Sequence, residues 1–205
     1  MDLGVTLAEE RPTPVTQWSY MKMRKIKLST ATAIVTLALV GTAFAADPMV
    51  GGAAMYPSKN IIQNAVNSKD HTTLVAAVKA GGLVDTLEGK GPFTVFAPTN
   101  EAFAALPAGT VDTLLKPENK KTLGKILTYH VVPGRLDSKA LDQDIEKGGG
   151  KAELTTVEGG KLTVTGTGKN LMVMDEKGNT AKVTIADVMQ SNGVILVVDK
   201  VLMPN

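Results

Sequence analysis

The stretch Gly91-Pro92-Phe93-Thr94-Val95-Phe96-Ala97-Pro98-Thr99-Asn100-Glu101-Ala102-Phe103 changes its local preference halfway along its length. Its first half, Pro92–Ala97, is a run of strand-forming residues that is typical of a buried strand. Pro98 ends such a strand because it has no backbone N–H to donate. Thr99 or Asn100 is then placed to cap a helix. We therefore expect a buried strand that leads through a sharp corner into a helix.

A second stretch, Ser191-Asn192-Gly193-Val194-Ile195-Leu196-Val197-Val198-Asp199-Lys200-Val201-Leu202-Met203-Pro204, lies near the end of the sequence. The Asn192-Gly193 pair is a strong signal for a tight turn. The run Val194–Val198 that follows is apolar throughout, which is typical of a strand buried on both faces. We expect this stretch to supply a turn and a central strand.

The remaining segments divide into a helical part and a strand-rich part. Before Gly148-Gly149-Gly150 the apolar residues mostly recur at helical spacing, as in Leu123, Ile126 and Leu127. After this glycine run come short strand candidates separated by turns rich in glycine and asparagine: 154–157, 162–165, 171–174, 181–188 and 194–202. Helices followed by a meander of strands predict an α+β fold in one domain.

A third segment, Leu127-Thr128-Tyr129-His130-Val131-Val132-Pro133-Gly134, lies between the two stretches. In order and spacing, the three segments resemble the first homology block, the central tyrosine–histidine motif and the second homology block of the fasciclin I-type domain family (beta-Ig-H3/fasciclin). The resemblance runs from about Asn60 to Pro204, and the chain is similar to small bacterial secreted single-domain members. It implies a fasciclin-like wedge of two β-sheets flanked by several short helices.

The two homology blocks consist mostly of residues that build a protein interior. Apolar strand residues, a capping corner and a glycine turn are instructions for folding. We therefore interpret the blocks as mainly structural, and this interpretation covers the following residues: Phe93, Thr94, Phe96, Ala97, Pro98, Thr99, Asn100, Phe103, Asn192, Gly193, Val194, Ile195, Asp199, Leu202 and Pro204.

The Tyr129-His130 pair allows two interpretations. The family motif is often described as a recognition site, which would make both residues binding residues. Alternatively, the pair is buried, with the hydroxyl and the imidazole satisfied by each other or by the backbone. The apolar neighbours Leu127, Val131 and Val132 favour the buried pair. Both interpretations hold if the pair shapes a nearby surface.

Asp187 and Val188 are a second candidate binding pair. They precede the second block at the place where the resemblance implies an Asp-Ile pair, which is implicated in integrin binding in animal relatives. Asp187 matches that pair, whereas Val188 replaces the isoleucine. Leu196 stands where many relatives carry histidine, which makes its strand more purely apolar.

The first 59 residues are predicted to lie outside the folded domain. Met21–Lys27 is basic, an uncharged stretch follows from Leu28, and Ala43-Phe44-Ala45 matches a cleavage pattern. We expect a secretory signal peptide over 21–45 with cleavage after Ala45, preceded by a misannotated extension over 1–20. Residues 46–59 are expected to be a flexible lead-in, and 60–205 the fasciclin-like domain. The mature chain is expected to have no transmembrane segment.

Composition excludes several classes of function. Removal of residues 1–45 takes away five of 22 Lys and Arg and three of 20 Asp and Glu, which leaves 17 of each and a net charge of zero. A neutral chain lacks the basic footprint of a nucleic-acid-binding protein. There is no cysteine, and the two histidines show no metal-ligand spacing, so we expect no metal and no cofactor.

These observations favour a secreted or periplasmic adhesion or protein-interaction module over an enzyme. No nucleophile motif is present, so no catalytic residue is predicted. The expected partner is a protein or a cell surface. The alternative is a carrier of a small apolar ligand in the cell envelope, with a pocket where the two sheets splay apart. Six methionines could line such a pocket: Met49, Met55, Met172, Met174, Met189 and Met203.

Overall fold

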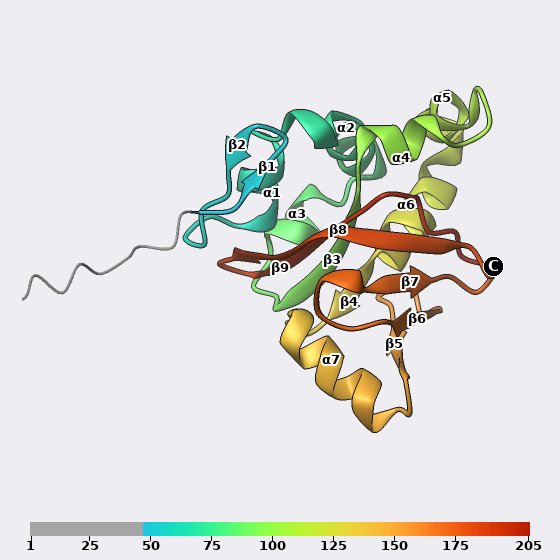
Figure 1. Ribbon diagram of the computed structural model, residues 1–205. Helices are drawn as coiled ribbons and strands as arrows, with labels where there is room; N and C mark the ends of the chain where they lie inside the picture. Colours follow the sequence, from blue (N-terminus) through green and yellow to red (C-terminus); the bar gives the residue numbers. More distant parts are fainter. Residues whose placement is uncertain (1–46) are drawn as a thin grey trace, which may run out of the picture. The chain divides into compact units, whose positions relative to one another are not determined.

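One seven-stranded sheet runs through the domain, with the strand order β4-β3-β9-β8-β7-β6-β5 (Figure 1). The structure is a computed structural model that describes residues 47–205, apart from the side chain of Lys169. β3 and β9 are parallel, and every other neighbouring pair in this sheet is antiparallel. The strands are β3 (Phe93–Pro98), β4 (Val131–Pro133), β5 (Lys151–Thr155), β6 (Lys161–Thr165), β7 (Met172–Met174), β8 (Thr180–Gln190) and β9 (Gly193–Val198).

Short helices make up most of the first half of the described chain. They are α1 (Ile61–Ala65), α2 (Thr72–Gly81), α3 (Val84–Glu88), α4 (Asn100–Ala104), α5 (Thr110–Leu114), α6 (Lys120–Tyr129) and α7 (Ser138–Lys147). Three single 3₁₀ turns cover Lys69–His71, Pro117–Asn119 and Gly168–Asn170. The predicted α+β class is confirmed. The predicted extension and signal peptide, residues 1–45, lie outside the described residues.

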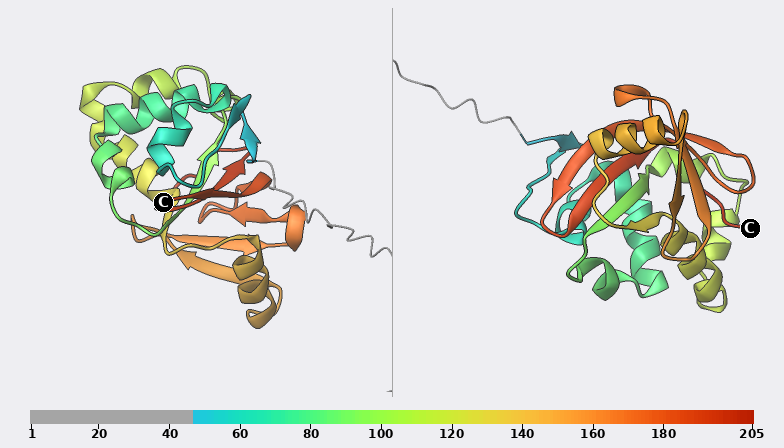
Figure 2. Two further views of the ribbon diagram at one scale, coloured as in Figure 1. Left: turned by 90° about the vertical axis from the view of Figure 1, so that its left-hand side faces the viewer. Right: turned by 90° about the horizontal axis from the view of Figure 1, so that it is seen from below.

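The sheet bends along β8, so it forms two layers that share this strand (Figure 2). The pairing of β8 with β9 shifts register between Val183 and Ile185 and again between Ile185 and Val188. Such bulges kink a strand and increase its twist. The predicted wedge corresponds to these layers, β4-β3-β9-β8 and β8-β7-β6-β5. At the far ends, Val157 N donates to the Val131 carbonyl over 2.7 Å, so the outer strands approach each other.

Two cores lie on opposite faces of β3 and β9. Successive side chains of a strand point to opposite faces. Val95 and Ile195 therefore pack in the core that β3 and β9 share with helices α1 to α6, whereas Phe96 and Leu196 pack between the two layers with α7. All six residues of β9 are buried, as the apolar run in the sequence predicts. Because β9 is buried on both faces, the apolar side chain of Leu196 packs within the core between the two layers.

Residues 47–59 are packed against the domain, and their expected role as a flexible lead-in is wrong. Met49–Val50 (β1) pairs with Ala53–Ala54 (β2) as an antiparallel hairpin. Val50 and Met55 are buried in the core on the helical side. Each strand of this hairpin has two residues, which is too few to show an alternation of apolar and polar side chains. The sequence pattern therefore did not predict the hairpin.

At the corner after β3, the structure shows which of the two capping candidates, Thr99 or Asn100, caps the following helix. Thr99 is the N-cap of α4, and its Oγ accepts a hydrogen bond from Ala102 N over 3.2 Å. Asn100 instead reaches the start of α2, where its Oδ1 accepts from Thr73 N over 3.0 Å and its Nδ2 donates to the Lys69 carbonyl over 2.8 Å. The two neighbouring residues thus fix two helices to one corner.

Candidate functional site

Tyr129 is the last residue of α6, and its ring is fully buried between the two sheet layers. Its hydroxyl donates to the Lys161 carbonyl over 2.7 Å and accepts from Glu176 N over 3.1 Å. Burial raises the pKa of Tyr129 to about 12 because ionisation would place a charge away from water. Tyr129 is therefore a neutral phenol that links α6 to Lys161 and Glu176 of the second layer.

His130 follows directly and is also buried. Its Nδ1 lies 2.8 Å from the Ile126 carbonyl, which can only accept, so Nδ1 carries the proton. Its Nε2 then accepts from Leu202 N over 3.0 Å. Burial lowers the pKa of His130 to about 4, because the charged form would lose hydration and the bond to Leu202. The imidazole is a neutral link between α6 and the last segment of the chain.

The Tyr129-His130 pair thus lies in the interior, and the two side chains bond to the backbone rather than to each other. Their partners come from α6 itself, from the loops around Lys161 and Glu176, and from Leu202. No face of either ring is presented to solvent. This geometry matches the buried interpretation. A recognition role would have to act through the surface that the pair supports.

Asp187 is held inside the bend of β8, with its backbone in the left-handed region at a φ of 59°. Its carboxylate accepts from Ser138 N over 2.6 Å and from Ser138 Oγ over 2.5 Å. Asp137 caps the same helix, accepting from Ala140 N over 2.8 Å. Both carboxylates satisfy free N–H groups at the start of α7. Asp187 therefore attaches α7 to the bend between the sheet layers.

Val188 is fully buried in the core on the helical side. Asp187 therefore holds the start of α7, whereas Val188 packs in the core. Val188 and His130 line the same cavity on the helical side, whereas Tyr129 lies in the other core, so the four candidate residues do not form one exposed site.

We expect the stability of Asp187 variants to fall in the order Asn, Gly, Ala. Asparagine tolerates a positive φ and keeps one acceptor, so it should cost about 1 kcal/mol. Alanine loses both hydrogen bonds and strains the backbone, at a cost of about 3 kcal/mol. Glycine removes the strain alone and should recover about 1 kcal/mol relative to alanine. Urea unfolding of the three variants tests this order, and equal stability of Asp187→Ala and Asp187→Asn would contradict it.

The homology-block residues are mainly buried, as their residue types indicate. Asn192 makes three side-chain hydrogen bonds. Its Oδ1 accepts from Ile61 N over 3.0 Å, and its Nδ2 donates to the carbonyls of Leu87 (2.7 Å) and Gly89 (2.9 Å). Buried with it are Thr94, Phe96, Ala97, Pro98, Phe103, Gly193, Val194, Ile195, Leu202 and Pro204, whereas Phe93, Thr99 and Asn100 are partly exposed and Asp199 is exposed.

Comparison with known proteins agrees with this arrangement of motifs. The family model described as "Fasciclin domain" matches residues 69–204. The chain belongs to the fasciclin domain family. It is 47% identical over 157 residues to protein sll1483 of Synechocystis, covering 76% of this chain and 79% of that protein. It is 36% identical over 160 residues to the cell surface glycolipoprotein MPB83 of Mycobacterium bovis, covering 78% of this chain and 62% of that protein.

The fold of this fasciclin domain also matches a solved structure. A domain pair from the insect cell adhesion molecule Fasciclin I superposes with a TM-score of 0.64. The match covers 71% of this chain and 51% of that chain, at 17% sequence identity. At this identity the comparison concerns the fold alone. It confirms the mixed arrangement of helices and layered strands described above.

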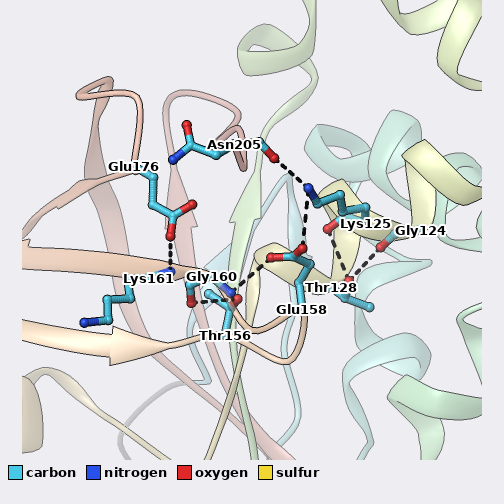
Figure 3. Close-up of polar contacts among 9 residues, drawn as sticks. All are labelled: Gly124, Lys125, Thr128, Thr156, Glu158, Gly160, Lys161, Glu176 and Asn205. Atoms are coloured by element: carbon cyan, nitrogen blue, oxygen red, sulfur yellow. Dashed lines mark hydrogen bonds and ion pairs between the residues drawn. The ribbon is translucent and has the colours of Figure 1, made fainter.

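A network of polar contacts joins α6 of this fasciclin domain to the 156–161 loop and to the last residue of the chain (Figure 3). Lys125 of α6 donates to the Asn205 carbonyl over 2.6 Å and lies 3.6 Å from Glu158. Glu158 in turn accepts from Gly160 N over 3.0 Å. A side chain at Gly160 would collide with the Tyr129 ring, since an added Cβ would lie 2.7 Å from it. The contacts hold the 156–161 loop against α6, although an ion pair with a half-exposed lysine adds little stability.

Three buried polar groups in this fasciclin domain were not found from the sequence. Asn64 bonds to Gln190 and to both backbone groups of Tyr56. Asp175 accepts from the backbone of Lys177, Asn179 and Met203. The third is His71 of the Lys69–His71 turn. Of these, only Asp175 could be expected from the sequence, because the residues from Asp175 to Asn179 are typical of a turn. Asn64 depends on Gln190, 126 residues away; His71 bonds to the nearby Ser68, but its burial comes from packing that the local sequence does not show.

Within residues 47–205, no three side chains of histidine, aspartate or glutamate gather where they could hold a metal ion. None of the helices in this described part has the length and apolarity needed to cross a membrane.

Proposed function

We propose that this fasciclin domain is an adhesion or protein-interaction module without catalytic activity, and that it works outside the cytoplasm after removal of residues 1–45. The observation that carries the proposal is the interior position of Tyr129, His130 and Val188. The motif residues build the fold, so contact with a partner is left to exposed side chains. Two similar proteins, a cell surface glycolipoprotein and a cell adhesion molecule, support the same class of function.

The exposed apolar side chains favour one region for this contact. Met49 (58% exposed), Tyr56 (42%) and Val66 (49%) belong to the N-terminal hairpin and to the segment around α1, and we call them the hairpin face. Figure 1 draws β1, β2 and α1 side by side, and Tyr56 bonds to Asn64 of α1. The Lys59 ammonium lies 4.9 Å from the centre of the Tyr56 ring. Methionine and aromatic residues are enriched in protein interfaces.

An attachment assay on intact cells tests the proposal. Beads coated with residues 46–205 should attach to cells of the producing organism more than albumin-coated beads do. Prior protease treatment of the cells should abolish attachment, because the expected partner is a protein. The triple variant Met49→Ser, Tyr56→Ser, Val66→Ser should lower attachment about tenfold, since a few anchor residues carry most of the energy of an interface.

The matched control for this assay is Val157→Ser combined with Met174→Ser. These side chains are 45% and 39% exposed, comparable to the hairpin face, but they lie after β5 and in β7. The control variant should attach like the unaltered domain. Attachment no greater than that of albumin-coated beads would refute the proposed function, and equal loss in both variants would refute the hairpin face as the contact.

A further inference from the structure

A cavity of about 50 Å³ lies on the helical side of β3 and β9. Nearly all of its wall is apolar, with contributions from the hairpin, α1, α2, α3 and both strands, including Met55, Val78 and Ile195. The position differs from the carrier pocket that the sequence suggested between splayed sheets. Of the six methionines predicted to line that pocket, Met55 alone lines this cavity.

The polar residues that line this cavity are Ser68, His71, Lys79 and His130, and of these Ser68 Oγ and both nitrogens of His130 already have hydrogen-bond partners. The His71 imidazole lines the cavity and is only 4% exposed. Its Nδ1 lies 2.9 Å from Ser68 Oγ, whereas its Nε2 has no hydrogen-bond partner. Among residues 47–205 it is the only buried side-chain nitrogen or oxygen without one. Burial lowers the pKa of His71, because the charged ring would lose its hydration, so the ring is neutral at neutral pH. An unpaired buried polar atom is costly and calls for a partner.

Water fits this space poorly. A buried water needs two to four polar partners, and apolar cavities stay dry. One water-sized sphere takes about 10–15 Å³ of such volume, so 50 Å³ accommodates roughly three to five non-hydrogen atoms. The cavity therefore suits a small aliphatic group that carries one hydrogen-bonding atom.

The cavity has a route to solvent between the first three helices. Ile62 of α1, Val75 of α2 and Val84 of α3 line it and are partly exposed, and Lys79 of α2 lines it and is exposed. Ala65, at the end of α1, is also partly exposed there.

We propose that the cavity binds a small aliphatic molecule with one oxygen that hydrogen-bonds to His71 Nε2, a short-chain alcohol in chemical class. The aliphatic part of the ligand contacts the apolar wall, and its oxygen hydrogen-bonds to the unpartnered nitrogen. The inference is independent of the proposed adhesive function.

The test uses 1-butanol and its apolar analogue 1-chlorobutane as probes, followed by NMR of the methyl groups and of the imidazole nitrogens. In the unaltered domain, 1-butanol should produce saturable shifts of the Val78 and Ile195 methyls and of His71 Nε2. It should bind about fivefold more tightly than 1-chlorobutane, because only the alcohol satisfies the nitrogen. Shifts that do not saturate, or that appear equally at the exposed Val66 and Val157, would overturn the proposal.

Variants separate the apolar and polar parts of the site. Ala65→Leu narrows the mouth and should weaken both probes at least about fivefold, while the matched Ala104→Leu, on the exposed side of α4, should leave binding unchanged. His71→Phe should remove the preference for the alcohol and keep the binding of 1-chlorobutane. Unchanged binding in Ala65→Leu, or a preserved preference in a folded His71→Phe domain, would contradict the inference.

Discussion

Replacing Asn192 with alanine should lower the free energy of unfolding by about 4 kcal/mol. The amide makes three hydrogen bonds, and its partners are backbone groups of α1 and of the segment from Leu87 to Gly89. The Ile61 N–H and the Leu87 carbonyl would be left buried and unsatisfied, at about 1–3 kcal/mol each, and the bond to the part-buried Gly89 carbonyl is worth about 1 kcal/mol. Urea unfolding monitored by circular dichroism measures the loss.

Two further variants make this result specific. Asn192→Asp should cost at least as much as alanine, because a carboxylate cannot donate and would face the carbonyls of Leu87 and Gly89. Asn170→Ala, at an exposed asparagine, should change stability by less than about 0.5 kcal/mol. A loss below about 1 kcal/mol in Asn192→Ala would show that the turn does not depend on this amide.

Acidification should destabilise the domain through His130 by about 3 kcal/mol. The folded pKa is about 4 and the ordinary value is 6.5, so the folded state holds the ring neutral. Above pH 6.5 both states are neutral and the stabilisation is complete. As the pH falls from 6.5 towards 4, the unfolded chain takes up a proton that the folded chain does not, and stability declines at about 1.4 kcal/mol per pH unit. Below pH 4 this residue adds no further loss.

The variant His130→Gln isolates this contribution. Urea unfolding of the domain and of the variant at pH 7.5 and pH 4.5 gives two losses of stability. Carboxylates contribute equally to both, so the difference reports the histidine. The unaltered domain should lose about 2.5 kcal/mol more than the variant over this interval. His71, whose pKa is also lowered by burial, acts in the same direction and remains in both proteins. Equal losses would contradict the assignment.

The strands and corners of the homology blocks could be predicted because their signals are local. The apolar run of β9 and the proline corner after β3 lie within a few residues of the structure they specify. The hairpin at Met49–Ala54 could not be predicted in this way. Its stability comes from burying Val50 and Met55 under α1 and α2, and a two-residue strand is too short to show a period.

The candidate site was harder to predict than the strands, because its hydrogen bonds join residues that lie far apart in the sequence. The sequence could not decide between recognition and burial for Tyr129 and His130, since both need a polar partner. The deciding partners, Lys161, Glu176 and Leu202, follow them by 32 to 72 residues. Only the folded chain brings these groups together.

Asp187 is a similar case. A lone aspartate before a homology block suggests an exposed carboxylate, and its family position suggested binding. The actual partner, Ser138, is 49 residues away at the start of α7. A sequence shows neither that the strand bends at this point nor that a helix begins beside the bend.

If the tyrosine–histidine motif is part of the interior, His130 must ionise well below the ordinary pKa of histidine. Nitrogen-15 NMR of the imidazole, assigned by its absence in His130→Gln, should show a neutral ring protonated on Nδ1. Its shifts should stay constant from pH 8 to pH 5 and move only near pH 4. A midpoint near 6.5, the ordinary value for an exposed histidine, would place the motif at the surface and contradict the account.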